Sequence, residues 1–281
     1  MINFGIGFVA GRYNVCDIIN YYHKDIVEQA KDLEVHFTFY ILYDLLYQDN
    51  KREGFYNIDG STYKHNNITI KYITPEDINE DRKILINRHN FNKNDVDLFL
   101  GYGHAKCRNT VMYYALNDHI DYLLFWDDDE YPIAVFQNND KTLSWKKQNN
   151  VMEHIKNIEN ANITIGYHCG YVSPIPNIDL EQKIVEEIHI KNFIEAISNE
   201  LVTWESIRDK YNNTNGVTYA LKENLKRGAR VMENVSESNG VAGSTLCLNM
   251  RQLDYIPAFY AAENSRRRRY FLFKPTWQIR F

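Results

Sequence analysis

The sequence has little of what marks disulfide-rich, membrane-spanning or nucleic-acid-binding proteins. Its four cysteines lie far apart and form no C-x-x-C pair, which argues against a disulfide framework or a zinc site and favours buried, reduced thiols. No apolar run approaches the length of a membrane span, and residues 1–10 lack the basic start of a signal peptide. A formal net charge of −5 at pH 7 argues against a nucleic-acid partner. We expect a cytoplasmic protein, with peripheral contact to the inner face of the membrane as a further option.

Hydrophobic residues, in contrast, are abundant. They make up 44% of the 281 residues, enough for one large core or two small ones. Apolar runs that end in turn residues predict strands at 2–9, 35–43, 67–73, 122–126, 163–172 and 243–250, and helical spacing predicts helices at 15–30, 105–116 and 146–158. Strands that alternate with helices predict an α/β fold with a mostly parallel sheet covered on both faces. The helical pattern at 178–232 is interpreted as an insertion into this fold.

An acidic cluster follows one of the predicted strands. Residues 125–132 read FWDDDEYP, so four carboxylates come directly after an apolar run, and they repel one another unless water or a cation compensates them. The cluster falls at the carboxyl end of a central strand, where open α/β sheets bind ligands. Mg²⁺ and Mn²⁺ prefer oxygen ligands, and Asp127 and Asp129 would point the same way if the strand geometry continued. The cluster predicts a metal–diphosphate site; a solvated acidic turn is the alternative.

A basic segment lies upstream of this strand. Lys106, Arg108 and Asn109 fall in the first turns of the helix predicted at 105–116. Lys106 and Arg108 could there reach a phosphate, and the amino end of the helix adds its own partial positive charge. Ordinary surface residues are the alternative, but the position just before the acidic strand favours the phosphate interpretation.

Taken in chain order, these features resemble the GT-A fold of nucleotide-sugar-dependent glycosyltransferases, in its GT2-like form. The similarity covers roughly residues 1–265 and rests on five matches: a first strand and Gly-Arg turn at 8–14, a second strand ending in Asp44, an A-x-x-R-N-like helix start at 105–109, an apolar strand leading into D-x-D at 127–129, and NGVAGS at 239–244. It implies one domain over residues 1–281. Within it, the nucleotide-sugar-binding half would take about residues 1–132, the acceptor half with its insertion about 133–265, and an atypical tail 266–281.

The resemblance also implies a site and a reaction. The donor would be bound by Arg12, Asp44, Lys106, Arg108, Asn109, Asp127 and Asp128, and Mn²⁺ or Mg²⁺ by Asp127 and Asp129. Asp44 would read the nucleoside with Arg12 near it, and Arg108 would approach the diphosphate or the donor sugar. The metal would stabilise charge on the departing diphosphate while an acceptor hydroxyl attacks the anomeric carbon. The implied partners are a nucleotide-diphosphate sugar and a glycan, lipid-linked saccharide or protein acceptor.

The chain departs from this pattern where the catalytic base is expected. Many inverting members carry the base in an acidic pair at the start of a helix after the last core strand. Here that region offers Glu263, then four arginines at 266–269 and no Asp or Glu up to residue 281. Glu263 is therefore the candidate base. A second interpretation is a truncated or frame-shifted tail, because AGA arginine codons read one base later as GAA glutamate codons.

Two other classes of protein stay open. A catalytically impaired nucleotide-sugar-binding protein of the same fold would keep the donor site and lose turnover, in line with the basic tail. A haloacid-dehalogenase-like, metal-dependent phosphatase also places D-x-D after an apolar strand, but usually has Thr or Val two residues after the second Asp, where this chain has Tyr131. Binding of a nucleotide sugar without turnover would favour the first class, and hydrolysis of a phosphomonoester the second.

Overall fold

The chain folds into two compact units. The computed structural model describes residues 1–11, 15–29, 33–44, 68–171, 187–197, 203–205, 208, 217–220, 228–229, 245–260 and 271–272. The first unit comprises Met1–Pro132, Asn149–Gly166 and Val231–Phe281, and the second comprises Ile133–Gln148 and Tyr167–Arg230. The prediction of one domain over the whole chain stays a prediction.

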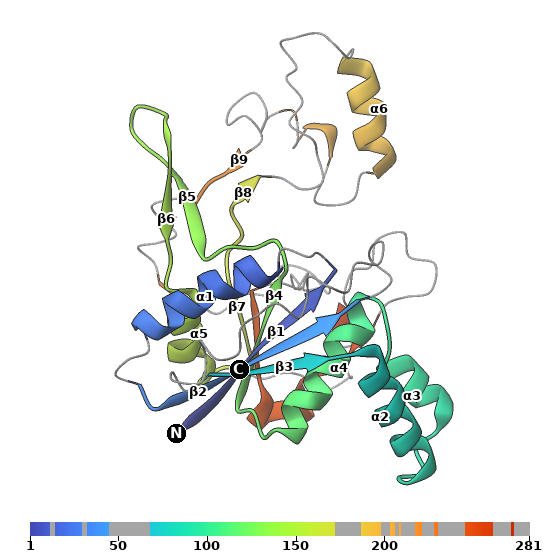
Figure 1. Ribbon diagram of the computed structural model, residues 1–281. Coiled ribbons are helices and arrows are strands. Elements are labelled where there is room, and N and C mark those ends of the chain that lie inside the picture. Colours follow the sequence, from blue (N-terminus) through green and yellow to red (C-terminus); the bar gives the residue numbers. More distant parts are fainter. Residues whose placement is uncertain are drawn as a thin grey trace. The chain divides into compact units, whose positions relative to one another are not determined.

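A six-stranded mixed sheet forms the centre of the first unit (Figure 1). The strands are β1 (Ile2–Ala10), β2 (Val35–Tyr43), β3 (Ile68–Ile73), β4 (Tyr122–Asp127), β7 (Ile163–Ile165) and β10 (Leu246–Asn249). β1, β2, β3 and β4 are parallel, whereas β10 runs antiparallel to both β4 and β7. The order across the sheet is β3-β2-β1-β4-β10-β7. This arrangement confirms the predicted α/β class with a mostly parallel sheet.

Helices cover both faces of this sheet (Figure 1). α1 (Val15–Gln29) and α5 (Asn150–Ile158) pack on one face, and α2 (Pro75–Asn87) and α4 (His104–Asn117) pack on the other. α3 (Lys93–Phe99) contacts α2 and α4, and the 3-10 helix η4 (Met250–Tyr255) follows β10. Among the described residues no helix is long and apolar enough to span a membrane.

The pleat of the strands assigns alternate residues to the two faces. On β4, Leu124 and Trp126 join the core beneath α1 and α5, whereas Leu123 and Phe125 join the core beneath α4. On β1 the side toward α4 carries glycine: a Cβ added at Gly7 would lie only 2.8 Å from Val111 Cγ1 of α4. Glycine at this position therefore lets α4 lie close against the sheet.

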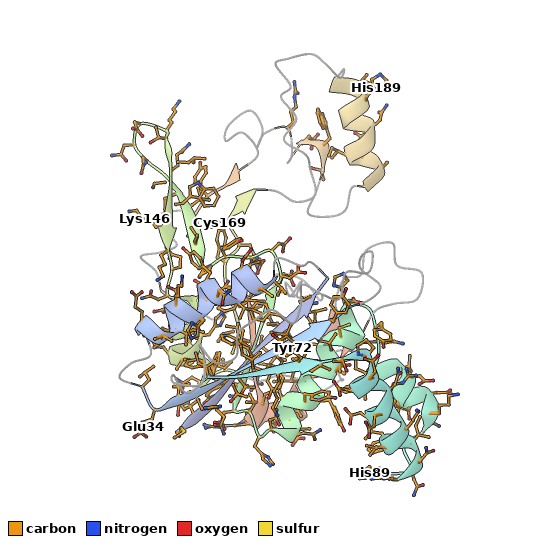
Figure 2. All side chains as sticks on the ribbon, in the orientation of Figure 1. Glu34, Tyr72, His89, Lys146, Cys169 and His189 are labelled. Carbon is orange, nitrogen blue, oxygen red and sulfur yellow. The ribbon has the colours of Figure 1, made fainter. Side chains whose placement is uncertain are left out.

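The second unit consists of short elements. β5 (Ile133–Gln137) and β6 (Leu143–Lys147) form a hairpin, β8 (Gly170–Tyr171) pairs with β9 (Val217–Thr218), and α6 (Glu187–Ile197) is helical. Lys146 on β6 and Cys169 just before β8 are labelled in Figure 2. The Val135 N–H donates to Cys169 Sγ at 3.4 Å, and the Ala220 N–H donates to the Val135 carbonyl at 2.8 Å. These bonds connect the hairpin to the segments around β8 and β9.

Several predicted elements differ from the observed ones. The strand predicted at 163–172 is two short strands in different sheets, β7 and β8, because residues 166–169 between them have no strand pairing. The helix predicted from residue 146 begins at Asn150, since the preceding residues belong to the β5–β6 hairpin. α2, α3 and that hairpin were not predicted. Within the helical region predicted at 178–232, the structure describes α6 and the short strand β9, and most of the rest lies outside the described residues.

Candidate functional site

Three neighbouring strands end at the same edge of the sheet, beside residues that the sequence singled out. β1 pairs with β2 up to Ala10 opposite Tyr43, and with β4 up to Val9 opposite Asp127. Asp44 follows β2 directly, and its N–H donates to the Ala10 carbonyl at 2.9 Å. The direction of strand addition reverses at β1, because β2 and β3 lie on one side of it and β4 on the other. Such a switch point is where open α/β sheets bind ligands, outside the carboxyl ends of the strands.

The pleat places Asp44 and Asp127 on the face of the sheet that α4 covers. Leu42 and Phe125, two residues earlier on each strand, both belong to the core beneath α4. α4 begins after Gly103, whose φ of 91° is a conformation that glycine adopts without strain. The first turns of α4 therefore lie at the same edge of the sheet as the two carboxylates.

Two consecutive residues of α4 reach these two carboxylates. Arg108 Nη2 donates to Asp127 Oδ1 at 2.7 Å. Burial raises the pKa of the Cys107 thiol, and the nearby Asp44 carboxylate raises it further. The Cys107 thiol itself donates to the Gly101 carbonyl at 3.6 Å. The first turns of α4 thus place the buried Cys107 thiol near Asp44, which follows β2, and bind Asp127 at the end of β4 through Arg108.

Arg108 lies beneath the site. Its side chain is 2% exposed, against 42% for Asp127, and its guanidinium lies 5.8 Å from the centre of the Phe125 ring. In this position Arg108 holds one oxygen of Asp127 and offsets its charge. The direct contact with the diphosphate or the donor sugar that the sequence suggested for Arg108 stays a prediction.

The acidic segment is a turn, and its carboxylates have different surroundings. β4 ends at Asp127, and Asp128 and Asp129 form the turn, so the strand alternation that would have aligned Asp127 with Asp129 does not continue. Asp128 is 4% exposed and accepts the Gly11 N–H at 2.8 Å, which ties the end of β1 to the end of β4. Asp129 is exposed. The accessible carboxylates of the D-x-D segment are therefore Asp127 and Asp129, and Asp128 holds the loop in place.

Lys106 and Asn109 both bond to the backbone of neighbouring elements. Lys106 Nζ donates to the Asp97 carbonyl of α3 at 2.6 Å. Asn109, 1% exposed, donates to the Phe259 carbonyl at 2.9 Å and accepts the Phe259 N–H at 2.8 Å. Phe259 begins β11 (Phe259–Tyr260), which pairs with β12 (Phe271–Leu272). These bonds position α4 against α3 and β11, and the donor contacts expected of Lys106 and Asn109 stay predictions.

Part of the predicted site lies outside the described residues. This applies to Arg12, which follows Gly11, to the candidate base Glu263 and to the segment 239–244. Their expected roles stay predictions.

The structure adds an aromatic layer that sequence reasoning missed. Trp126 stacks on Tyr22 of α1 with ring centres 3.6 Å apart, and each side chain is 1% exposed. Burial raises the pKa of Tyr22, and the charge of Glu130 raises it further. Tyr21, the residue before Tyr22 on α1, meets Tyr131 edge to face, with ring centres 5.7 Å apart. Alternation on β4 was the available signal, because it turns Trp126 away from Asp127 and toward α1.

The carboxylates of the D-x-D segment are the candidate ligands for a metal ion. Within the described part of the chain, no group of three or more His, Cys, Asp or Glu side chains is arranged to hold one. Asp127 and Asp129 nevertheless present accessible oxygen donors of the kind that Mg²⁺ and Mn²⁺ prefer. One or two protein carboxylates suit a cation whose other ligands are phosphate oxygens and water.

Comparisons with known proteins give a limited answer. No protein-family model matches the chain, and no curated protein does. Among solved structures, two of the mannosyltransferase Ktr4p from S. cerevisiae are similar, the second in complex with GDP. They are 12% and 13% identical to the chain, with TM-scores of 0.32 and 0.31. Each covers 91% of this chain, which spans 57% and 58% of the two mannosyltransferase chains. Similarity at these values does not assign the chain to a family.

Proposed function

We propose that the chain is a nucleotide-sugar-dependent glycosyltransferase of the GT-A fold. It would transfer a sugar from a nucleotide-diphosphate donor to a hydroxyl group of a glycan, a lipid-linked saccharide or a protein. The observation that carries the proposal is the meeting of Asp44, Asp127 and the first turns of α4 at the switch point of the sheet. A nucleoside diphosphate needs polar groups for its nucleoside and compensation for its diphosphate charge, and this edge offers candidates for both.

The carboxylates of Asp127 and Asp129 fit a divalent cation, Mn²⁺ or Mg²⁺. Both are accessible hard oxygen donors, and Arg108 holds one oxygen of Asp127 at 2.7 Å. When bound, such a cation supplies Lewis-acid stabilisation of the negative charge that develops on the departing diphosphate.

The remaining residues would act by positioning. The bond from the Gly11 N–H to Asp128 joins the two strand ends between which the donor would lie. Asp44, at the end of β2, would accept hydrogen bonds from the nucleoside, with Arg12 near it. Lys106 and Asn109 would support the donor by fixing α4 against α3 and β11, where their hydrogen bonds are made.

The reaction also requires a base for the acceptor hydroxyl, and Glu263 is the candidate. A carboxylate there would take the proton as the hydroxyl oxygen attacks the anomeric carbon. A second function, donor binding without turnover, is favoured by a specific feature of the sequence: residues 264–281 contain four consecutive arginines and no Asp or Glu. Loss of a general base typically lowers the rate by about 10²–10⁴-fold and leaves the donor site intact.

A thermal-shift screen followed by a turnover assay tests the proposal and separates the two functions. The screen uses UDP, GDP, ADP and dTDP, each with Mn²⁺ or with a chelator. A nucleotide at 100 times its dissociation constant should add about 2.7 kcal/mol of stability. Stabilisation by none of the four, with or without metal, would contradict the proposal. Release of sugar from the matching nucleotide sugar supports the transferase, and stabilisation without release supports the binding protein.

A further inference from the structure

An exposed aromatic pair stands directly beside the acidic turn. Tyr131 is 45% exposed and Tyr21 is 37% exposed, although both side chains carry a large apolar ring. Their rings meet edge to face, at 88° and with centres 5.7 Å apart. In such a pair one ring turns its edge toward the face of the other, so each ring keeps at least one face that its partner does not cover. Tyr21 therefore supports Tyr131 and leaves a face of it for another partner.

The surroundings of this pair combine apolar faces with hydrogen-bond acceptors. Tyr131 follows Glu130 directly and lies two residues beyond the exposed Asp129. A pyranose ring has the matching pattern, since it presents an apolar face of C–H groups and a rim of hydroxyl donors. Carboxylates accept strong hydrogen bonds from hydroxyl groups, and aromatic faces pack against C–H groups.

Two buried donors belong to α1, which carries Tyr21, and to β4, which precedes the acidic turn. Tyr22 and Trp126 are each 1% exposed. Among the described residues, neither the Tyr22 hydroxyl nor Trp126 Nε1 has a hydrogen-bond partner. Burial raises the pKa of the Tyr22 hydroxyl, and the charge of Glu130 raises it further. An unsatisfied buried donor destabilises the folded state, so folded proteins generally supply such groups with a partner.

We propose that Tyr131, supported by Tyr21 and flanked by Asp129 and Glu130, forms a subsite for a neutral pyranose ring. This inference rests on the proposed function and extends it by naming residues that hold a saccharide. The ring could belong to the acceptor or to the donor, because both present the same C–H face and hydroxyl groups.

The test compares two kinds of probe on four forms of the protein. The first kind is free methyl glycosides of glucose, galactose, mannose and N-acetylglucosamine, and the second is UDP and GDP with and without a linked sugar. The forms are the unaltered chain, Y131A, Y131F, which keeps the ring, and Y255A, which removes another exposed tyrosine ring, on η4. Titrations followed by NMR give the affinities, and thermal unfolding shows that each form is folded.

The proposal predicts that Y131A weakens saccharide binding roughly two- to tenfold, the value of one aromatic contact. Y131F and Y255A should bind like the unaltered chain. An effect on free glycosides assigns the ring to the acceptor, and an effect only on the sugar-linked nucleotides assigns it to the donor. If Y131A binds every saccharide probe as tightly as Y255A does, or if no saccharide binds any form, the subsite is refuted. Glycosides that depend on Tyr131 in a protein that binds no nucleotide would keep the subsite and refute the proposed function.

Discussion

The ion pair between Arg108 and Asp127 makes the two carboxylates of the D-x-D segment energetically unequal. Asp127→Ala removes the partner of an arginine that is 2% exposed, whereas Asp129→Ala removes an exposed carboxylate from a cluster of like charges. The first substitution should therefore destabilise the metal-free protein. The second should leave its stability unchanged or raise it, because carboxylate repulsion is relieved.

The expected size of the loss follows from burial. A hydrogen bond to a charged group is worth about 1.5–3 kcal/mol, and breaking a fully buried ion pair from one side costs about 3–5 kcal/mol. Since Asp127 keeps 42% of its side chain exposed, water screens part of this interaction. We expect Asp127→Ala to lower the free energy of unfolding by about 2 kcal/mol, which corresponds to roughly 4–8 °C in Tm.

Urea unfolding of the two variants in a chelating buffer measures the difference. A double-mutant cycle with Arg108→Met isolates the pair, because the methionine retains the apolar stem of the arginine. The coupling free energy should exceed about 1 kcal/mol, and the midpoints should shift without a change in slope. Equal losses in Asp127→Ala and Asp129→Ala, together with a coupling near zero, would refute the role given to Arg108.

Two further predictions concern groups that position the sheet and α4. Burial lowers the pKa of His154 from 6.5 to about 4, and this ring lies 2.7 Å from Thr164 Oγ1. Between these pH values the unfolded chain binds more protons than the folded one, so stability should fall by roughly 3 kcal/mol as pH drops from 6.5 to 4. Urea titrations should show that the stability of His154→Gln does not fall in this way between pH 6.5 and 4. An equal fall in the variant would contradict the lowered pKa of His154. Asn109→Ala removes two buried hydrogen bonds to Phe259 and should cost about 2–3 kcal/mol of stability; calorimetry of the folded variant should also show a weaker nucleoside diphosphate affinity, because α4 loses its attachment to β11. A loss of affinity at unchanged stability would instead place Asn109 on the donor, and unchanged affinity would contradict its supporting role.

The central sheet could be predicted because its strands leave a strong pattern. β1, β2 and β4 are nearly continuous apolar runs that are buried on both faces, and each is followed by turn or acidic residues. Parallel strands of this kind place their following residues at one edge, so the sequence also indicated that Asp44 and Asp127 would lie near each other.

Other elements left weaker patterns. α2 begins with a capping box formed by Thr74 and Asp77, yet only Pro75 and Ile78 of this helix are buried, so its apolar periodicity is slight. β6 is mostly exposed, and its sequence LSWKK alternates poorly. Local patterns of this strength do not distinguish a helix or a hairpin from a loop.

The sequence did not predict which side chains pair at the site, because this depends on how α4 packs against the sheet. The sequence placed Arg108 at a helix start and Asp127 at a strand end, but their contact depends on how closely α4 approaches the sheet. That approach depends on Gly7, where a Cβ would lie 2.8 Å from Val111. A single sequence does not reveal which glycine of a strand faces which helix, so the ion pair between Arg108 and Asp127 was not predicted.

Calorimetric titration with the nucleoside diphosphate that gives the largest thermal shift tests the central claim most directly. The unaltered chain, Asp129→Ala and Asp254→Ala are compared with Mn²⁺ and with a chelator; Asp254 is an exposed carboxylate on η4 and serves as the matched control. The account predicts that the unaltered chain and Asp254→Ala bind the nucleotide with Mn²⁺. Asp129→Ala should bind the nucleotide about tenfold more weakly, as expected when a charged ligand loses a charge-assisted contact. The chelator should weaken binding to the unaltered chain by a similar factor. Equal affinity in all three forms, insensitive to the chelator, would contradict a metal-dependent nucleotide site at this edge of the sheet.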